Sequence, residues 1–405
     1  MRVLQIVPSM HPNAGGISQG IRNIIPELEK LGLPNEVVCL DDPAEDFFSK
    51  DPFTITALGI AKGPWQYNAK LLPWLVDNLG RFDVIIVNAL WLYHGYAFIK
   101  ALKKYKAMQV SLGKPLQYPR FYIMPHGMLD PYFQNAPERK LKALRNLAYW
   151  KLIESKLVNT ADGLLFTCKT ELLLARESFR PYHPKREFNI GYGVQPPPPF
   201  DDKMQAAFLA KCPQVKDKPF ILFLSRVHEK KGVDLLIKAY SALLEKTGLA
   251  SLSPFPKLVI AGPGMETEYG KEIQQLAATS KALQASVYFT GMLAGDAKWG
   301  AFYATEAFVL PSHQENFGIA VVEALACGKP VLISSQVNIW PEIMEANAGI
   351  VEDDTLEGTV KLLEAWLNLP VTDKNLLNSN AVKCYEDYFK IESAAKKFIE
   401  MLTLK

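Results

Sequence analysis

Short apolar runs alternate along the chain with segments whose apolar residues follow the spacing of a helix. In the first half of the chain the apolar runs occupy residues 3–7, 36–40, 83–88, 121–125 and 163–167. Amphipathic segments such as 17–31 lie between them. Fully apolar strands are typical of sheets buried on both faces, and intervening helices are typical of parallel connections. The pattern therefore predicts an α/β domain with a doubly wound parallel sheet.

Four successive prolines, at 196–199, interrupt this pattern after an apolar run at 188–194. Proline cannot occupy a helix interior or donate to a sheet, so we place a domain boundary there. The runs resume at 219–227, 257–262, 287–291, 307–312 and 330–334. We predict two Rossmann-like domains, 1–194 and 195–383. Because ligands of open α/β sheets bind at the carboxyl ends of the strands, we expect the two sheets to face a cleft.

The composition is that of an ordinary globular protein. The 405 residues are 49% hydrophobic, which is enough chain for two cores. The formal net charge is +3, from 45 Lys and Arg against 42 Asp and Glu, so no nucleic-acid partner is indicated. The five cysteines show no C-x-x-C spacing, and neither a signal peptide nor a long apolar span is visible. We therefore expect a cytoplasmic protein with reduced thiols.

Two cations follow the first apolar run of the second domain. The segment "SRVHEKKG" places Arg226 and Lys231 in the loop that leads to the next helix. A guanidinium fork and an ammonium group at a strand end can converge on a diphosphate. Arg and Lys are also common solvated residues at such positions, so the pair alone leaves both interpretations open.

Gly15 and Gly16 lie between the first predicted strand and the first helix, in "HPNAGGISQG". Glycines there allow a backbone to approach a phosphate or a sugar closely, although a plain tight turn explains them equally well. With Asp41 and Asp42 at the end of the second strand, the segment also permits a dinucleotide-dependent oxidoreductase. The spacing G-G-x-x-x-G argues against that alternative, because its fingerprint is G-x-G-x-x-G.

Two carboxylates lie on either side of a small apolar run in "SHQENFGIAVVEALACGKPV", residues 312–331. Glu315 precedes a helical pattern that begins near Gly318, and Glu323 lies inside that helix. A helix N-terminus offers unpaired backbone N–H groups and the positive end of the dipole to a phosphate. Two acids beside such a site are suited to accept hydrogen bonds from sugar hydroxyls.

Taken together, these segments resemble the retaining glycosyltransferases of the GT-B fold, specifically the large nucleotide-sugar family 4. The pattern E-x-F-G-I-x-x-x-E-A-x-A-x-G-x-P-V is the specific element, and "NAGGIS", "MPHG", "LSRVHEKKG" and "FTG" support it. The resemblance covers nearly the whole chain and is strongest from 219 to 345. It implies that the nucleotide sugar binds the second domain, that the acceptor binds the first, and that residues 384–405 cross back onto the first.

The resemblance also implies a role for individual residues. Arg226 and Lys231 clamp the diphosphate, Glu315 binds the transferred sugar, and Glu323 holds the ribose. The implied catalytic residues are His126, Glu315, Arg226 and Lys231. The implied donor-binding residues are Gly15, Gly16, Arg226, Lys231, Gly291, Met292, Glu315, Asn316, Phe317, Gly318, Ile319 and Glu323.

His126 ends a strand of the first domain, in "MPHGMLD". A lone histidine is more often structural than catalytic. The resemblance reverses this preference, since it implies that His126 contacts the transferred sugar near the reacting carbon without acting as a base. His11, Asn88 and His94 are acceptor-side candidates, because they lie near the glycine loop or a strand end.

The chain contains no D-x-D pattern, so we expect no metal and no other cofactor. Fixed cations and a helix dipole would then neutralise the leaving diphosphate. The resemblance implies retention of anomeric configuration, a donor such as UDP-glucose with GDP-mannose next, and a saccharide or lipid-linked saccharide acceptor in polysaccharide synthesis. A GT-B protein that binds sugar nucleotides without transfer, or an epimerase of the same fold, stays open as an alternative.

A basic amphipathic stretch, "ERKLKALRNLAYWKLIESKL", occupies residues 138–157. Helices of this kind can lie on anionic lipid, which would mean peripheral contact with the cytoplasmic face of a membrane. An ordinary surface helix whose lysines cover its flank explains the stretch as well. We favour the surface helix, although a lipid-linked acceptor would favour the membrane.

Overall fold

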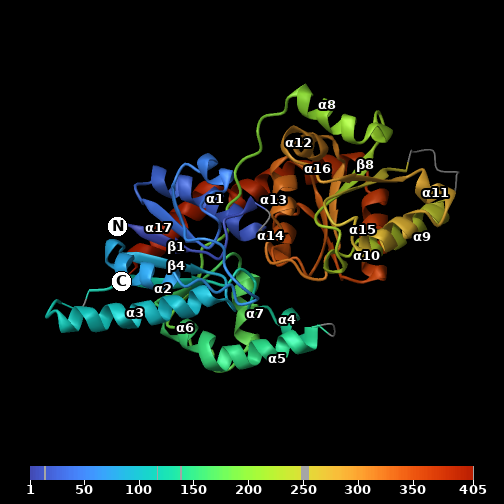
Figure 1. Cartoon of the computed structure of the whole chain (residues 1–405). Coiled ribbons are helices and arrows are strands. Elements are labelled where there is room, and N and C mark those ends of the chain that lie inside the picture. The colour runs from blue at the N-terminus through green and yellow to red at the C-terminus, as the bar shows by residue number, and fades with distance from the viewer. Residues whose placement is uncertain (13–14, 116, 137–138, 248–254, 405) are drawn as a thin grey trace. The chain divides into compact units, whose positions relative to one another are not determined.

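The computed structural model describes residues 1–12, 15–115, 117–136, 139–247 and 255–404 (Figure 1). The chain forms two compact units. The first comprises Met1–Gly193 together with Ile391–Lys405, and the second comprises Val194–Lys390. Each unit is built on one sheet whose strand pairs are all parallel, which confirms the predicted pair of doubly wound α/β domains.

The first sheet has seven strands in the order β3-β2-β1-β4-β5-β6-β7. Their bounds are β1 (Val3–Ile6), β2 (Asn35–Cys39), β3 (Thr54–Ala57), β4 (Val84–Asn88), β5 (Arg120–Met124), β6 (Gly163–Phe166) and β7 (Glu187–Asn189). The central strands β1 and β4 are buried along their whole length, as their apolar sequences require.

Helices cover both faces of this sheet. They are α1 (Gly16–Lys30), α2 (Leu71–Asn78), α3 (Tyr93–Ser111), α4 (Tyr132–Asn135), α5 (Lys140–Tyr149), α6 (Ser155–Thr160), α7 (Lys169–Ser178) and α17 (Ile391–Thr403), with the short helical segments η2 (Asp46–Lys50), η3 (Leu79–Arg81) and η5 (Trp150–Glu154). Alternate residues of one strand face opposite cores. Leu4 packs in the core that includes Leu75 of α2 and Phe98 of α3, whereas Val3 packs with Leu28 of α1 and Phe398 of α17.

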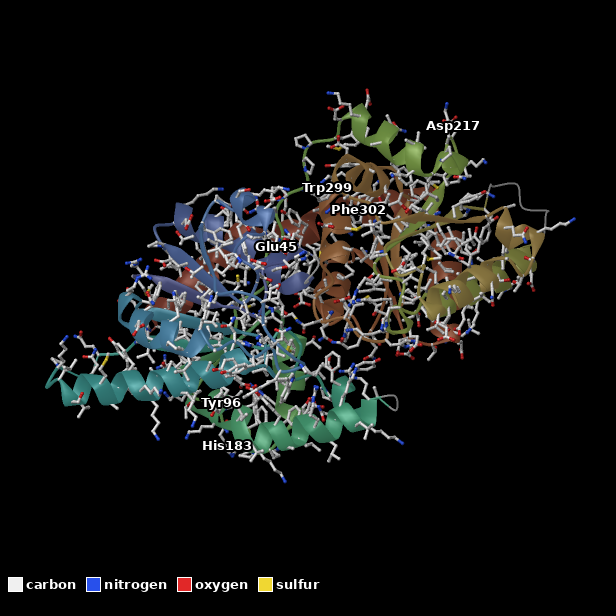
Figure 2. All side chains as sticks on the ribbon, viewed as in Figure 1. Glu45, Tyr96, His183, Asp217, Trp299 and Phe302 are labelled. Atoms are coloured by element: carbon white, nitrogen blue, oxygen red, sulfur yellow. The ribbon has the colours of Figure 1, made fainter. Side chains whose placement is uncertain are left out.

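The second sheet has six strands in the order β10-β9-β8-β11-β12-β13. Their bounds are β8 (Phe220–Leu224), β9 (Lys257–Ala261), β10 (Val287–Gly291), β11 (Ala307–Leu310), β12 (Val331–Ser334) and β13 (Gly349–Glu352). The helices of this unit are α8 (Asp202–Lys211), α9 (Val233–Thr247), α10 (Glu268–Ala277), α11 (Lys281–Gln284), α12 (Gly295–Ala304), α13 (Ile319–Ala326), α14 (Trp340–Glu345), α15 (Leu356–Asn368) and α16 (Val371–Cys384), with the short segments η6 (Pro213–Val215), η7 (Glu229–Lys231) and η9 (Tyr385–Phe389). Phe302 of α12, labelled in Figure 2, is fully buried and packs near Phe308 of β11.

Two strands were not anticipated from the sequence. Both β3 and β13 lie at sheet edges, where a strand has one neighbour and less need of an apolar sequence. Their segments "TITA" and "GIVE" are short and partly exposed, so no fully apolar run marks them. Conversely, the apolar run at 188–194 is a strand only as far as Asn189, because Gly191 adopts a left-handed conformation with φ of 74°.

The chain passes between the units at two places, near Gly193 and near Lys390. Helix α17 packs beside α1 in the first unit. The segment 384–390, which the sequence interpretation grouped with α17, lies in the second unit instead. The reason is that Val194 N donates to Phe389 O (2.9 Å) and the Tyr385 hydroxyl donates to Val194 O (3.0 Å). None of the described helices combines the length and apolar content that crossing a bilayer requires.

Candidate functional site

The loops that follow β8 and β11 in the second unit are bonded to each other. These strands are neighbours in the sheet, so their carboxyl ends lie side by side. Lys230 O accepts hydrogen bonds from His313 N (2.8 Å) and from Ser312 Oγ (2.9 Å). The two bonds fix the position of Lys231, in the first loop, relative to Glu315, in the second.

Lys231 and Glu315 form an ion pair in which Lys231 Nζ donates to Glu315 Oε2. The side chains are 9% and 22% exposed, so the pair is largely shielded from water. Burial disfavours the charged form of Glu315, but the nearby cations Lys231, Lys230 and Arg226 outweigh it and lower the pKa of Glu315. Glu315 is therefore held as a carboxylate, which can accept hydrogen bonds from hydroxyl groups.

Glycines allow the close approach of these loops. Gly232 adopts φ of 67°, and a Cβ atom there would lie 2.1 Å from Pro311 O. The loop that carries Arg226 is similarly packed, since a Cβ atom on Gly262 would lie 1.8 Å from Ser225 O. Arg226 itself is exposed, so its guanidinium is accessible to a ligand. The structure thus brings the charge of Arg226 near the Lys231–Glu315 pair at the end of β8.

Helix α13 begins directly after this pair. Its N-cap is Gly318, with φ of 78°, and no described side chain caps it or places an acid in its first turn. The backbone of Glu315 is fixed on both sides, because its N donates to Gln336 O and its O accepts from Asn338 N, both at 2.9 Å. Phe317 is buried, while Asn316 and Ile319 are partly buried. The helix therefore presents an uncapped N-terminus beside Glu315, an arrangement suited to an anion.

Glu323 of α13 is paired with Lys298 of α12, a residue that the sequence interpretation missed. Lys298 Nζ donates to Glu323 Oε1 at 2.7 Å, and the side chains are 23% and 13% exposed. The ammonium group also lies 4.1 Å from the ring centroid of Trp299, which Figure 2 labels. Gly291 ends β10, at the edge of the same sheet, and Met292 follows it and is exposed.

In the first unit, His126 is bonded to a chain of buried amides that ends at a backbone carbonyl. His126 Nε2 lies 2.9 Å from Asn88 Oδ1, and Asn88 Nδ2 donates to Gln5 Oε1. Gln5 Nε2 in turn donates to Asn35 Oδ1. The last bond runs from Asn35 Nδ2 to the backbone oxygen of Leu33. A carbonyl only accepts, so the direction of every bond in the chain is fixed. It follows that His126 Nε2 carries the proton and that Nδ1 keeps a lone pair.

The backbone around His126 is held by a buried carboxylate that sequence reasoning also missed. His126 adopts φ of 52°, and burial lowers its pKa to about 3, so the ring is neutral at neutral pH. Glu171 of α7 accepts from the next backbone N–H, Gly127 N, at 2.6 Å, and from Thr167 N and Oγ1 at 2.8 and 2.6 Å. Its position in the first turn of a helix after an apolar run was the available signal.

The two other candidate histidines differ in environment. His94 is 1% exposed, its Nε2 donates to Asn88 O at 2.8 Å, and burial lowers its pKa to about 4. It therefore supports the end of β4, and Asn88 is itself buried between the two histidines. His11 is partly buried, and its ring packs edge-on against Phe47 with a centroid distance of 5.2 Å.

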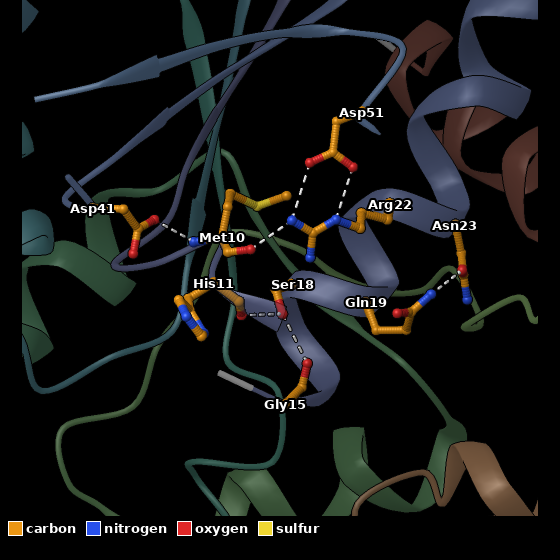
Figure 3. A network of polar contacts seen from close by, with 9 residues as sticks. All are labelled: Met10, His11, Gly15, Ser18, Gln19, Arg22, Asn23, Asp41 and Asp51. Atoms are coloured by element: carbon orange, nitrogen blue, oxygen red, sulfur yellow. Dashed lines mark hydrogen bonds and ion pairs between the residues drawn. The ribbon is translucent and has the colours of Figure 1, made fainter. Parts of the chain in front are cut away.

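The loop before α1 is stabilised by a charged residue of α1 and by carboxylates of neighbouring loops (Figure 3). Asp41 accepts from Ser9 Oγ (2.5 Å) and Met10 N (2.6 Å), and Arg22 donates to Met10 O and to Asp51. The carboxylate of Asp41 thus accepts hydrogen bonds from within the protein. A dinucleotide-dependent enzyme would instead need an acid at this position to bind the ribose hydroxyls.

The two predicted glycines follow this loop. Gly15 adopts φ of 91° before α1, and Gly16 O accepts from the Tyr192 hydroxyl at 2.6 Å. Residues 13 and 14 of the predicted "NAGGIS" loop lie outside the described residues. Across the described part of the chain, no three His, Cys, Asp or Glu side chains are grouped so that they could hold a metal ion.

The second unit is similar in sequence to known proteins. Residues 205–383 match the family described as "Glycosyl transferases group 1". The chain is 36% identical over 191 residues to an uncharacterized glycosyltransferase of Methanocaldococcus jannaschii, covering 46% of this chain and 45% of the relative. It is 22% identical over 368 residues to a sulfoquinovosyl transferase of Arabidopsis thaliana, covering 86% of this chain and 62% of the relative. These alignments span less than two thirds of either relative's own length.

Solved structures with low sequence identity share the fold along the whole chain. A glycosyltransferase from Rickettsia africae has a TM-score of 0.75 and 14% identity, over 99% of this chain and 97% of that one. The Anabaena protein HepE, solved with UDP and glucose, has a TM-score of 0.71 and 18% identity, over 100% and 99%. Residues 205–383 therefore resemble the glycosyl transferases group 1 family, and the chain as a whole shares the fold of its GT-B structural neighbours.

Proposed function

We propose that this chain is a glycosyltransferase that moves a sugar from a nucleoside diphosphate sugar to a saccharide or lipid-linked saccharide acceptor. The observation that carries the proposal is the Lys231–Glu315 pair beside the uncapped N-terminus of α13. A cation and backbone N–H groups match a diphosphate, and a carboxylate matches sugar hydroxyls. The group 1 domain, which contains both residues, supports this assignment.

Each part of the donor molecule has a proposed binding residue. Arg226 and Lys231 hold the diphosphate, Glu315 binds the transferred sugar, and Glu323 binds the ribose. Both acids are paired with lysine in the ligand-free chain, so the donor has to replace at least part of these contacts. The backbone of residues 316–318 and the edge residues Gly291 and Met292 complete the proposed donor site.

The proposed chemistry needs no metal ion. Arg226, Lys231 and the α13 dipole neutralise the charge that develops on the leaving diphosphate. Configuration is retained if the acceptor attacks on the face from which the phosphate departs and the phosphate oxygen takes the acceptor's proton. His126 contacts the transferred sugar as a neutral ring, whose Nδ1 can accept a hydrogen bond from a hydroxyl.

UDP-glucose or a related UDP-sugar is the proposed donor, with GDP-mannose next. The structural similarity to HepE, which was solved with UDP-glucose, supports this choice. We propose a polysaccharide or glycolipid precursor as the acceptor. Relatives named for small phosphorylated compounds, such as a mannosylfructose-phosphate synthase of Agrobacterium fabrum, make a small soluble acceptor the first alternative to test.

Calorimetric titration of the purified chain with UDP-glucose, GDP-mannose, UDP and GDP tests the proposal. One nucleotide sugar and its free diphosphate should bind, and Arg226→Ala or Lys231→Ala should weaken the diphosphate by about 1.5–3 kcal/mol, as expected for a lost charge-assisted bond. Unchanged diphosphate affinity in both variants would reject the clamp. A sugar epimer formed without any acceptor would identify an epimerase instead.

Turnover in the presence of EDTA tests the metal-independent chemistry. We expect the rate to be unchanged, because fixed cations replace the metal. Complete loss of turnover that magnesium or manganese restores would contradict this part of the proposal while leaving the donor site in place.

A further inference from the structure

The outer surface of the helix formed by α5, η5 and α6 exposes an unusual number of leucines. Leu141 is 86% exposed, Leu144 66%, Leu147 44% and Leu152 79%. Single exposed leucines are normal on protein surfaces, but several on one face of one helix form an apolar patch. A helix that only covered its own domain would direct these side chains inward, so the patch indicates an external partner.

Cations are interspersed with these leucines. Lys140, Lys142, Arg145 and Lys151 are all exposed. Among the described residues, no carboxylate forms an ion pair with any of the four. The acid inside the helix, Glu154, is buried and accepts from Trp91 N at 2.8 Å, so it adds no negative charge to the outer surface.

The neighbouring helix α3 extends this basic surface. Helix α3 contacts both η5 and α6, and Figure 1 shows α3 and α5 along the same side of the first unit. It contributes exposed Lys100, Lys103 and Lys104. The two helical segments, residues 93–111 and 140–160, contain nine Lys and Arg against one Glu, whereas the whole chain has 45 Lys and Arg against 42 Asp and Glu. The positive charge of the protein is therefore concentrated on these two helices.

The inner face of the helix is firmly attached to the unit. Trp150 is 1% exposed and stacks on Phe179 with a centroid distance of 4.8 Å. Tyr149 accepts a hydrogen bond from Trp65, whose ring lies 5.5 Å from that of Tyr96 (labelled in Figure 2). The exposed leucines are thus held in place by a packed helix. Partly buried Trp and Tyr side chains at its flank are of the type that favours the interface of a bilayer.

We propose that the outer face of α5, η5 and α6, together with the lysines of α3, docks on an anionic lipid bilayer. Leucines enter the boundary of the acyl region while ammonium and guanidinium groups stay at the level of the lipid phosphates. A protein partner would need acidic groups between apolar pockets at the same spacing, whereas a bilayer supplies both chemistries at any position. The sequence alone favoured an ordinary surface helix, and the exposure of the leucines is the observation on which we instead propose contact with a membrane.

Co-sedimentation of the full chain with lipid vesicles tests the proposal. The chain should bind vesicles of mixed phosphatidylcholine and phosphatidylglycerol and should not bind vesicles of phosphatidylcholine alone. About 1 M salt should weaken binding, because it shortens the screening length to about 3 Å. The assay contains no sugar nucleotide, so its result is independent of the proposed transfer reaction. Absence of binding to the mixed vesicles would overturn the proposal.

Two sets of substitutions separate the charged and the apolar contributions. Neutralising Lys140, Lys142 and Arg145 to Gln should lower partitioning about 100-fold, since each cation near an anionic surface contributes about fivefold. Leu141→Gln with Leu144→Gln should lower partitioning about 100-fold, because each leucine side chain that leaves water contributes about tenfold. The matched control, Val371→Gln with Leu376→Gln on exposed positions of α16, should bind as the unmodified chain does.

The outcome also distinguishes a lipid from a second copy of the chain. Circular dichroism and melting temperature should show that every variant is folded. If the leucine variant kept full vesicle binding, the leucines would not contact lipid and the proposal would be wrong. The proposal would also be wrong if vesicles did not bind and the chain formed a dimer that dissociates in the leucine variant. The patch would then be a protein interface.

Discussion

At the scale of single residues, the second unit pairs each proposed ligand acid with a lysine. Glu315 is paired with Lys231 and Glu323 with Lys298. Such partners hold both carboxylates in place, and the cations around Glu315 lower the pKa of that carboxyl group. They also mean that removing either acid leaves a partly buried ammonium group without its partner, which costs stability as well as binding.

The two glutamates should differ in which ligand they affect. Glu323→Ala should weaken both the nucleotide sugar and the free nucleoside diphosphate, because both contain ribose. Glu315→Ala should spare the diphosphate and lower turnover, because its contacts strengthen toward the transition state. Calorimetric titration with both ligands and melting temperatures on both variants measure this. Diphosphate affinity lost in Glu315→Ala and kept in a folded Glu323→Ala would show that the roles are reversed.

His94 should make the stability of the first unit depend on pH. Its pKa is about 4 in the folded protein because burial disfavours the charged ring, and it returns to its usual value near 6.5 on unfolding. As pH falls below 6.5 the unfolded chain takes up the proton first, so stability is lost until the folded pKa is reached. The loss is about 3 kcal/mol over this window.

Urea unfolding of the unmodified chain and of His94→Gln between pH 7 and pH 4 measures this contribution. Other titrating groups affect both proteins equally, so the difference between the two curves isolates the histidine. The difference in unfolding free energy should shrink as pH falls. Parallel curves across the range would mean that His94 is not held neutral in the folded chain.

At the scale of elements, the sequence predicted the buried strands and the loops that carry the site, and it missed what depends on neighbours distant in sequence. Apolar runs located β8 and β11, so Lys231 and Glu315 could be expected at strand ends. Their contact depends on β8 and β11 being adjacent in the sheet, which spacing cannot reveal. Lys298 was missed for the same reason, since its partner Glu323 lies on another helix. The edge strands β3 and β13 lacked the apolar signal because they are partly exposed.

Gly232 should be indispensable to the joined loops after β8 and β11. Gly232→Ala introduces both a left-handed alanine and a Cβ atom 2.1 Å from Pro311 O, so the two loops must separate. Gly113→Ala is a matched control, because Gly113 also has positive φ, 62°, but has nothing within 4 Å of its Cβ position. The control should lose about 1 kcal/mol of unfolding free energy.

The Gly232 variant should lose clearly more stability than the control and should also lose affinity for the nucleoside diphosphate, because Lys231 would move with the loop. Urea unfolding and calorimetric titration of both variants provide the comparison. Equal stability losses in the two variants would mean that the loops can relax without contact to Pro311.

At the scale of the whole molecule, the two units differ in how the chain builds them. The second unit is one continuous segment, Val194–Lys390, whereas the first needs Ile391–Lys405 in addition to Met1–Gly193. Helix α17 supplies part of the core of the first unit through Phe398, Met401 and Leu402, each at most 3% exposed. All the residues proposed to contact the donor except Gly15, Gly16 and His126 lie in the continuous unit, so binding of the nucleoside diphosphate should be separable from the stability of the first unit.

Removing residues 391–405 should therefore unfold the first unit and leave binding of the nucleoside diphosphate intact. The three large apolar side chains of α17 stabilise the fold by about 5–9 kcal/mol when buried, which is comparable with the whole stability of a typical domain. The segment 194–390 expressed alone should fold cooperatively and bind the nucleoside diphosphate with the affinity of the full chain. A truncated chain, 1–390, should lose one thermal transition and keep the other. A calorimetric scan of the full chain, of 194–390 and of 1–390 measures these transitions. If 194–390 failed to fold, or if 1–390 melted like the full chain, the second unit would not fold independently of the first.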